Sequence, residues 1–273
     1  MKIARFTGSE GDQWGFVEAG EVRPVGAEIT MLSALADKAA LSEAYASAGS
    51  GVPLSDVRLL APIPEPPQFI GVGLNYRAHA EEAGFDVPTV PVTFPFHRSA
   101  IIGTGAVIEI PSFSDMIDWE AELAIVIGSG GRDIPVESAL GHIAGYTIVN
   151  DVTARDVQKA DGQWSRAKSF DTFKPMGPWI TTTDEIGTAN NLEISLTVND
   201  VIMQASSTAD LIFGVPEIVS YISKATTLLP GAVIPTGTPA GIGLSRTPPQ
   251  FLQAGDVVSV EVTGIGTLTN PVG

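Results

Sequence analysis

The sequence contains no cysteine, and this absence removes several kinds of chemistry at once. Disulfide bonds, thiol nucleophiles and cysteine-ligated zinc are all excluded. The absence agrees with a reducing compartment, and the first residues lack the apolar core of a signal peptide, so we expect a cytoplasmic protein. No apolar run approaches the roughly 18 residues that a membrane-spanning helix needs, so we expect no membrane partner.

Positive charge is also scarce, with 15 basic against 31 acidic residues and a formal net charge of −16. Such a chain repels phosphate backbones, so we expect no nucleic-acid partner. Histidine occurs only three times, so an imidazole base has to be His79, His97 or His142. The motifs Gly-x-Ser-x-Gly and His-Glu-x-x-His are both missing, which argues against a serine hydrolase and a zinc protease.

Glycine and proline are plentiful, at 29 and 20 residues, which is typical of short strands joined by turns. We therefore expect a mainly β fold of the α+β type with peripheral helices. The predicted strands are Lys2–Phe6, Trp14–Glu18, Glu21–Pro24, Phe69–Val72, Ala106–Ile110, Glu120–Ile127, His142–Asn150, Trp179–Thr182, Leu192–Val198, Val233–Pro235 and Val257–Val262. The predicted helices are Met31–Ala48, a short helix after Asn75, Pro135–Leu140 and Val215–Ala225.

A proline-rich segment, Ala61–Pro67, is compatible with neither a helix nor a central strand. We place a domain boundary there, between a small N-terminal α+β domain, residues 1–60, and a larger domain, residues 61–273. The alternative is an extended crossing within a single domain. The chain is long enough to bury a core in either case.

The stretch Asp118–Gly128 carries the strongest signal for chemistry. Side chains of a strand alternate between faces, so Asp118, Glu120 and Glu122 would share one face. Neighbouring carboxylates repel each other unless water on an exposed strand edge or a divalent cation compensates. The spacing alone does not distinguish a solvated edge from a metal site. Asp151 ends an apolar strand and either caps the next turn or joins the two glutamates in an all-oxygen site, which would favour Mg²⁺ or Mn²⁺ over zinc.

The segment after Asn75 supplies a candidate base. If Asn75 caps a short helix that Gly84 ends, His79 and Glu82 share a face. A carboxylate beside an imidazole raises its basicity, as a general base requires. The alternative is an ordinary charged surface helix, and His97 is then the next candidate.

Two further segments could bind an anion. Lys168 could neutralise an anionic substrate, although a solvated loop lysine is the simpler interpretation. The segment Thr236–Gly243 is rich in glycine, so it is either a tight turn or a place where backbone N–H groups approach an anionic ligand.

Taken together, these residues resemble the fumarylacetoacetate hydrolase family over roughly residues 60–273. The motifs that carry the resemblance, in order, are Gly71–Glu82, Asp118–Gly128, Gly145–Gln158, Lys168–Pro178, Pro230–Gly243 and Gly255–Val272. The resemblance implies a mixed-β-roll catalytic domain, a smaller N-terminal domain and a homodimer. It implies Mg²⁺ or Mn²⁺ on Glu120, Glu122 and Asp151. It also implies His79 with Glu82 as the acid–base pair, Lys168 as a further catalytic residue, and substrate contacts from Arg155, Gln158, Gly237 and Thr238.

Two positions depart from the family pattern. Phe96 stands where many members carry a lysine or arginine, and either Arg98 replaces that charge or the pocket is more apolar there. Ala232 stands where an aspartate usually follows Pro230-Gly231, a difference that we expect to affect only a turn.

The expected function is that of a metal-dependent hydrolase that cleaves a carbon–carbon bond in an acylpyruvate or a 1,3-diketo acid, with a small anionic oxoacid as the substrate. The alternative is a decarboxylase or isomerase of a related 2-oxoacid, which uses the same stabilisation of an enolate without an attacking water. A catalytically silent binder of metal and oxoacid is a third possibility. The pairing of His79 with Glu82 argues against it, because a binder needs no acid–base pair.

Overall fold

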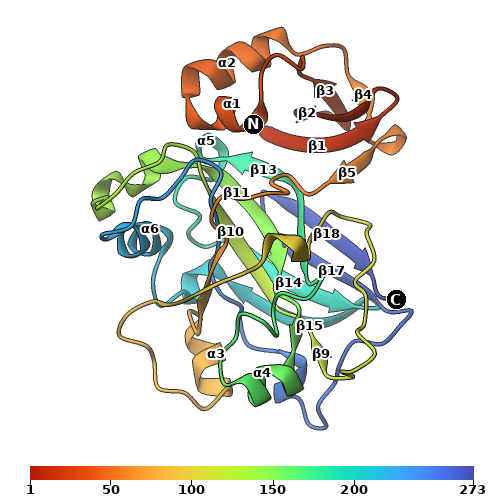
Figure 1. Cartoon of the computed structure of the whole chain (residues 1–273), viewed down its shortest axis with the longest axis vertical. Helices are drawn as coiled ribbons and strands as arrows, with labels where there is room; N and C mark the ends of the chain where they lie inside the picture. The colour runs from red at the N-terminus through yellow and green to blue at the C-terminus, as the bar shows by residue number, and fades with distance from the viewer.

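The computed structural model describes all 273 residues. Figure 1 shows the N-terminal strands and helices at one end of an elongated molecule and a larger β-rich body at the other. Strands far outnumber helices, and the helices lie at the periphery. The predicted mainly β fold with peripheral helices is confirmed.

The N-terminal end is an antiparallel meander covered by two short helices. Its strands are β1 (Lys2–Gly8), β2 (Gly11–Glu18), β3 (Glu21–Pro24), β4 (Val52–Pro53) and β5 (Arg58–Leu60). The helix predicted over residues 31–48 is divided into α1 (Met31–Ala36) and α2 (Lys38–Ser47). Asp37 divides it, because its backbone is extended and its carboxylate accepts a hydrogen bond from Ala39 N at 2.8 Å.

The largest sheet continues from this meander into the larger body. Beyond β1 it consists of β13 (Lys174–Thr182), β11 (Ile143–Asn150), β10 (Ala121–Ile127) and β16 (Val233–Pro235), each antiparallel to the next, and β8 (Ile101–Ile102) pairs with β13 in parallel. Ile3 of β1 lies opposite Ile180 of β13. One apolar cluster contains Ile3 and Phe16 together with Val126 and Val149, so the two ends of the molecule share buried surface.

A second sheet packs against the first to form the main core. It consists of β15 (Val201–Ser207), β14 (Glu193–Val198), β17 (Val257–Val262) and β18 (Gly266–Pro271). Leu123 and Ile148 of the first sheet lie in the same cluster as Leu196 and Val260 of the second. Strands β15 and β18 were not predicted. The strand predicted over residues 106–110 is not formed, since only Ile108 makes an isolated bridge there.

Shorter elements lie around the two sheets. They are β6 (Ile70–Gly73), β7 (Val92–Pro95), β8 (Ile101–Ile102), β9 (Ile117–Asp118), β12 (Thr153–Ala154), α3 (Arg77–Glu82), α4 (Arg155–Asp161), α5 (Thr183–Ile186) and α6 (Val215–Ser223). The predicted helix at 135–140 is a 3₁₀ helix, Val136–His142. Helix α4 was not predicted. None of the helices combines the length and the apolar character required to cross a bilayer.

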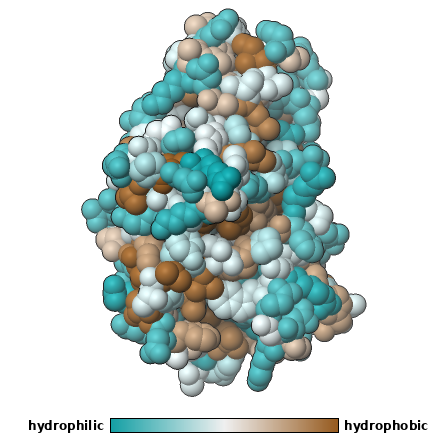
Figure 2. Space-filling view, turned by 60° about the vertical axis from the view of Figure 1, so that its left-hand side comes forward, coloured by the Kyte–Doolittle hydropathy of each residue, from teal (hydrophilic) through white to brown (hydrophobic).

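The segment after α3 presents apolar side chains to solvent. Phe85, Val87, Val90 and Val92 are all exposed. Figure 2 brings this side of the molecule forward, and apolar patches gather in the lower half of that face between hydrophilic residues. This part of the surface is therefore apolar, although the composition of the whole chain is acidic.

The shared core predicts that both ends of the molecule unfold together. Ile3 is fully buried, so Ile3→Ala should lower the free energy of unfolding by about 2–5 kcal/mol. Chemical denaturation should then show one transition at lower denaturant. Ile202→Ala is the matched control, because Ile202 is 65% exposed and its truncation should change little. Two separate transitions, of which Ile3→Ala shifts only one, would contradict the shared core.

Candidate active site

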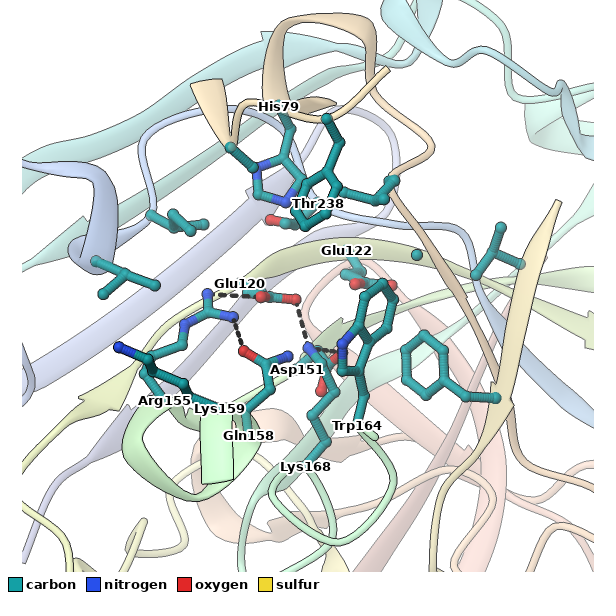
Figure 3. A pocket seen from close by; sticks show the side chains of 18 of the residues that line it. His79, Glu120, Glu122, Asp151, Arg155, Gln158, Lys159, Trp164, Lys168 and Thr238 are labelled. Carbon is teal, nitrogen blue, oxygen red and sulfur yellow. Dashed lines mark hydrogen bonds and ion pairs between the residues drawn. The ribbon is translucent and has the colours of Figure 1, made fainter. Parts of the chain in front are cut away.

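A cavity of about 580 Å³ opens beside helices α3 and α4. Most residues predicted for the site line it, and Figure 3 shows them converging from several elements. The predicted residues in its wall are His79, Glu120, Glu122, Asp151, Arg155, Gln158, Lys168 and Thr238. The sequence therefore predicted the composition of one cavity from residues up to 159 positions apart.

Three acids meet at the ends of two paired strands. Glu120 precedes β10, Glu122 lies in β10, and Asp151 follows β11, where Asp151 N donates to the carbonyl of Glu120 at 2.9 Å. One oxygen from each carboxylate lies within 4.8 Å of the others. All three acids are buried, so the solvated-edge interpretation is wrong. Asp151 does not cap the next helix either, because α4 begins four residues later, after Ala154.

Lys168 bridges two of these acids. Its ammonium donates to Glu120 Oε2 at 2.8 Å, to Asp151 Oδ2 at 2.7 Å and to Thr153 Oγ1 at 2.9 Å. The side chain is buried, so the interpretation as a solvated loop lysine is wrong. Burial opposes its charge, but Asp151 and Glu120 outweigh burial and raise the pKa of Lys168.

Arg155 connects the acids to a neighbouring loop. Its Nε donates to Asp118 Oδ2 at 2.8 Å, and its second terminal nitrogen lies 2.6 Å from Glu120 Oε1. Asp118 is fully buried and also accepts hydrogen bonds from the backbone N–H groups of Gly243 and Leu244. Arg155 therefore links α4 to Glu120 and, through Asp118, to the loop after β16. It also donates a hydrogen bond to Gln158 at 3.1 Å.

A second buried lysine, Lys174, was missed by the sequence reasoning. It begins β13, is fully buried, and its Nζ lies 2.7 Å from Asp151 Oδ1. Burial lowers the pKa of Lys174 to about 8, although Asp151 opposes the shift. The available signal was a charged residue at the start of an otherwise apolar strand.

The acids differ in how readily they ionise. Burial opposes the charge on Glu120, but Lys168 and Arg155 outweigh it and lower the pKa of Glu120 to about 2. Burial, Asp151 and Glu120 together raise the pKa of Glu122 well above its usual range. Three buried carboxyl groups whose mutual repulsion raises the pKa of Glu122 suit a hard divalent cation such as Mg²⁺ or Mn²⁺.

The predicted contact between His79 and Glu82 is formed, but not with the predicted cap. His79 Nδ1 lies 3.4 Å from Glu82 Oε2 in α3, and Glu82 Oε1 accepts from Gly241 N at 2.9 Å. Asn75 does not cap this helix. Its amide instead donates to the carbonyls of Thr236 and Phe213, which anchors the start of the helix in the core.

His79 is the only histidine in the cavity wall. His97 is exposed and lies outside the wall. The Nδ1 of His142 lies 2.8 Å from the carbonyl of Ser129, away from the cavity. Glu82 is not part of the wall and reaches the cavity only through His79.

The glycine-rich segment holds side chains as well as forming a turn. Gly237 N donates to Glu122 Oε2 at 2.8 Å, so this N–H positions an acid. Gly237 has a φ of +103°, and a Cβ there would lie 3.0 Å from the Val72 carbonyl oxygen. Thr238 lies in the cavity wall and accepts a hydrogen bond from Gln204 at 2.8 Å.

An apolar wall faces the charged one and was not predicted in detail. It includes Phe85, Phe94 and Trp164, with Phe94 and Trp164 packed edge to face at 5.2 Å. Figure 3 shows Trp164 beside Lys168. Phe96 itself lies behind this wall, and Arg98 is exposed and pairs with Glu65, so Arg98 does not supply the charge that position 96 lacks.

The fold and this acidic cavity define a family, and comparison with known proteins agrees. Residues 68–273 match the family described as fumarylacetoacetate (FAA) hydrolase C-terminal, and residues 1–62 match the family described as Rv2993c-like, N-terminal. The chain belongs to the fumarylacetoacetate hydrolase family. The family is enzymatic, and its named members include tautomerases, isomerases and hydrolases.

Individual relatives differ in their reactions. The chain is 46% identical over 220 residues to the mitochondrial oxaloacetate tautomerase fahd2 of Xenopus laevis, which covers 80% of this chain and 69% of that protein. It is 38% identical to the fumarylacetoacetate hydrolase of Exiguobacterium antarcticum, with a TM-score of 0.86 and coverage of 100% and 99%. It is also 38% identical to the 5-carboxymethyl-2-hydroxymuconate delta-isomerase of Mycobacterium smegmatis, with a TM-score of 0.83 and the same coverage.

The acidic cluster generates a prediction about metal binding. Mg²⁺ or Mn²⁺ should raise the melting temperature, because the cation relieves repulsion among Glu120, Glu122 and Asp151. Glu122→Gln should lose most of this rise. Because glutamine removes the repulsion that Glu122 experiences from Asp151 and Glu120, the variant should melt at or above the metal-free wild type. Thermal unfolding with and without metal measures both effects. Glu109→Gln, at an exposed position, is the control, and an unchanged metal-induced rise in Glu122→Gln would disprove the site.

Proposed function

We propose that this chain is a divalent-cation-dependent enzyme that moves a proton on the carbon beside the oxo group of a small anionic 2-oxoacid, as a tautomerase or isomerase. The observation that carries the proposal is His79, held at Nδ1 by Glu82 and facing the same cavity as three buried carboxylates. A binding protein has no need for such a pair.

The charged wall suits an oxoacid. Mg²⁺ or Mn²⁺ on the three acids would stabilise the negative charge that develops on the oxo oxygen when the neighbouring carbon loses a proton. Lys168 and Thr238 lie in the same wall and can contact the substrate's oxygens, while Gln158 offers an amide. The apolar wall with Trp164 and Phe94 excludes water from that end of the cavity.

Proton transfer is the task of His79. Its second ring nitrogen accepts the proton from the carbon, and the carboxylate of Glu82 stabilises the imidazolium that forms. The same imidazolium then returns the proton to the oxygen, for tautomerisation, or to another carbon, for isomerisation. No water is consumed, so atoms balance without a further reactant.

Hydrolysis of an acylpyruvate is the second candidate. It was the first expectation from the sequence, and the similarity to the Exiguobacterium hydrolase supports it. Here His79 would take a proton from water, which attacks the distal carbonyl. The tautomerase of Xenopus and the isomerase of Mycobacterium favour the reaction without water, and we therefore place it first.

The remaining expectations stay predictions. A homodimer is one of them, and light scattering coupled to size-exclusion chromatography measures it directly. Decarboxylation of a 2-oxoacid is another, and no feature of the cavity favours it over the other reactions.

The assignment of His79 predicts a large loss of activity. Positioned general bases typically contribute about 10²–10⁴-fold to the rate, so His79→Ala should slow oxaloacetate tautomerisation by a factor in that range. Its affinity for Mn²⁺ should stay close to that of the wild type, because His79 is not one of the three acids. The keto–enol absorbance change gives the rate, and calorimetry gives the affinity.

The control is His97→Ala, which removes an exposed imidazole outside the cavity and should leave the rate unchanged. Acylpyruvates tested in ¹⁸O-labelled water separate the two reactions, because only hydrolysis places the label in the released acid. A wild-type rate in His79→Ala would show that the base is wrongly assigned. Label transfer without tautomerisation would reverse the order of the two candidate functions.

A further inference from the structure

Lys174 is the one buried cation beside the acids that does not line the cavity. Its ammonium donates to the carbonyls of Phe173 at 2.8 Å and Val152 at 3.1 Å, and lies 2.7 Å from Asp151 Oδ1. All of these groups belong to the protein. Lys174 therefore acts on the site from behind Asp151 and does not meet a substrate.

Asp151 is held from two sides. Lys168 pairs with Oδ2 on the cavity side, and Lys174 pairs with Oδ1 on the core side. Burying a charged lysine this completely costs desolvation free energy, which an uncharged residue at the same position would not lose. The charge of Lys174 therefore calls for an explanation other than packing.

The environment of Lys174 explains the unusual Phe96. The ammonium lies 4.8 Å from the centroid of the Phe96 ring, whose face attracts a cation. A basic side chain at position 96 would bring a second ammonium next to Lys174. An ammonium beside Asp151 can thus come from position 96 or from position 174. In this chain Lys174, at the start of β13, supplies it.

The charge of the cluster depends on Lys174. Four buried carboxyl groups, Asp118, Glu120, Glu122 and Asp151, face three buried cations, Arg155, Lys168 and Lys174. With all four carboxyl groups ionised around a divalent cation, the loaded cluster carries one net positive charge. Without Lys174 the loaded cluster would be neutral.

We propose that Lys174 is a positioning residue that holds Asp151 from the core side and leaves the cation-loaded site positive, so that the site captures an anionic oxoacid. The inference rests on the metal site of the proposed function. It does not depend on whether the reaction is tautomerisation or hydrolysis.

The test removes the charge and keeps an N–H donor at this position. Lys174→Gln offers two N–H groups in place of three, enough for Asp151 and one of the two carbonyls. Calorimetry at pH 7 measures Mn²⁺ affinity first and then the affinity of the Mn²⁺-loaded protein for oxalate, a dianionic probe. One unit charge at about 6 Å in an effective dielectric of about 20 changes the affinity for each unit of anionic charge by roughly 100-fold, so the affinity for oxalate should fall by at least about that factor. Mn²⁺ should bind at least as tightly as in the wild type, because a repelling charge is gone.

The double variant Phe96→Lys with Lys174→Gln should recover most of the oxalate affinity, since it returns an ammonium to the same place from the other side. If the single variant does not fold, folding and oxalate binding by the double variant carry the same conclusion. The control is Lys224→Gln, at an exposed lysine far from the cavity.

Three results would overturn the inference. Oxalate affinity equal to wild type in Lys174→Gln would show that the lysine only packs. Loss of Mn²⁺ binding in that variant would show that Lys174 serves metal binding through Asp151 and not capture of the anion. A wild type that binds no Mn²⁺ would remove the metal site and this inference together, whereas the first two results leave the proposed function intact.

Discussion

The burial of four carboxyl groups within one small volume is the constraint on which the site depends. Removing a carboxylate from water costs several kcal/mol unless opposite charge and hydrogen bonds replace the solvent. Arg155, Lys168 and Lys174 supply most of that charge, and they come from a helix, a loop and a strand. The negative charge of Glu122 is not balanced by these three cations, because burial, Asp151 and Glu120 raise its pKa. A further cation at the site would balance it.

The sheet makes this burial possible. Strands β10 and β11 are largely apolar and antiparallel, and Ala121 pairs with Asn150, so Glu120 and Asp151 lie at the same end of the strand pair. Rigid elements thus fix the acids, whereas the base lies on a short helix tied down by Asn75 and by the bond from Gly241 to Glu82. The site combines a fixed anion cluster with a base on a more peripheral element.

Elements with strong periodicity were predicted well, and weakly marked ones were not. The strand Glu120–Ile127 and the helix Val215–Ala225 correspond closely to β10 and α6. Helix α4 was missed because it has no side-chain cap, and β15 was missed because its apolar residues, Val201 to Met203, are consecutive and do not alternate with polar ones. Asp37 interrupts a predicted helix because its side chain accepts a hydrogen bond from the backbone N–H of Ala39.

The sequence by itself determined which groups are available: no thiol, three imidazoles, paired acids at a strand, and an ordered series of family motifs. It could predict Glu120, Glu122, Asp151 and His79 because each lies in a locally recognisable pattern. Only the tertiary structure decided that Lys174 faces Asp151 and that Arg98 faces solvent. The physical reason is that pairing between buried charges depends on distances across the fold, and residues far apart in the chain carry no local signal of their proximity.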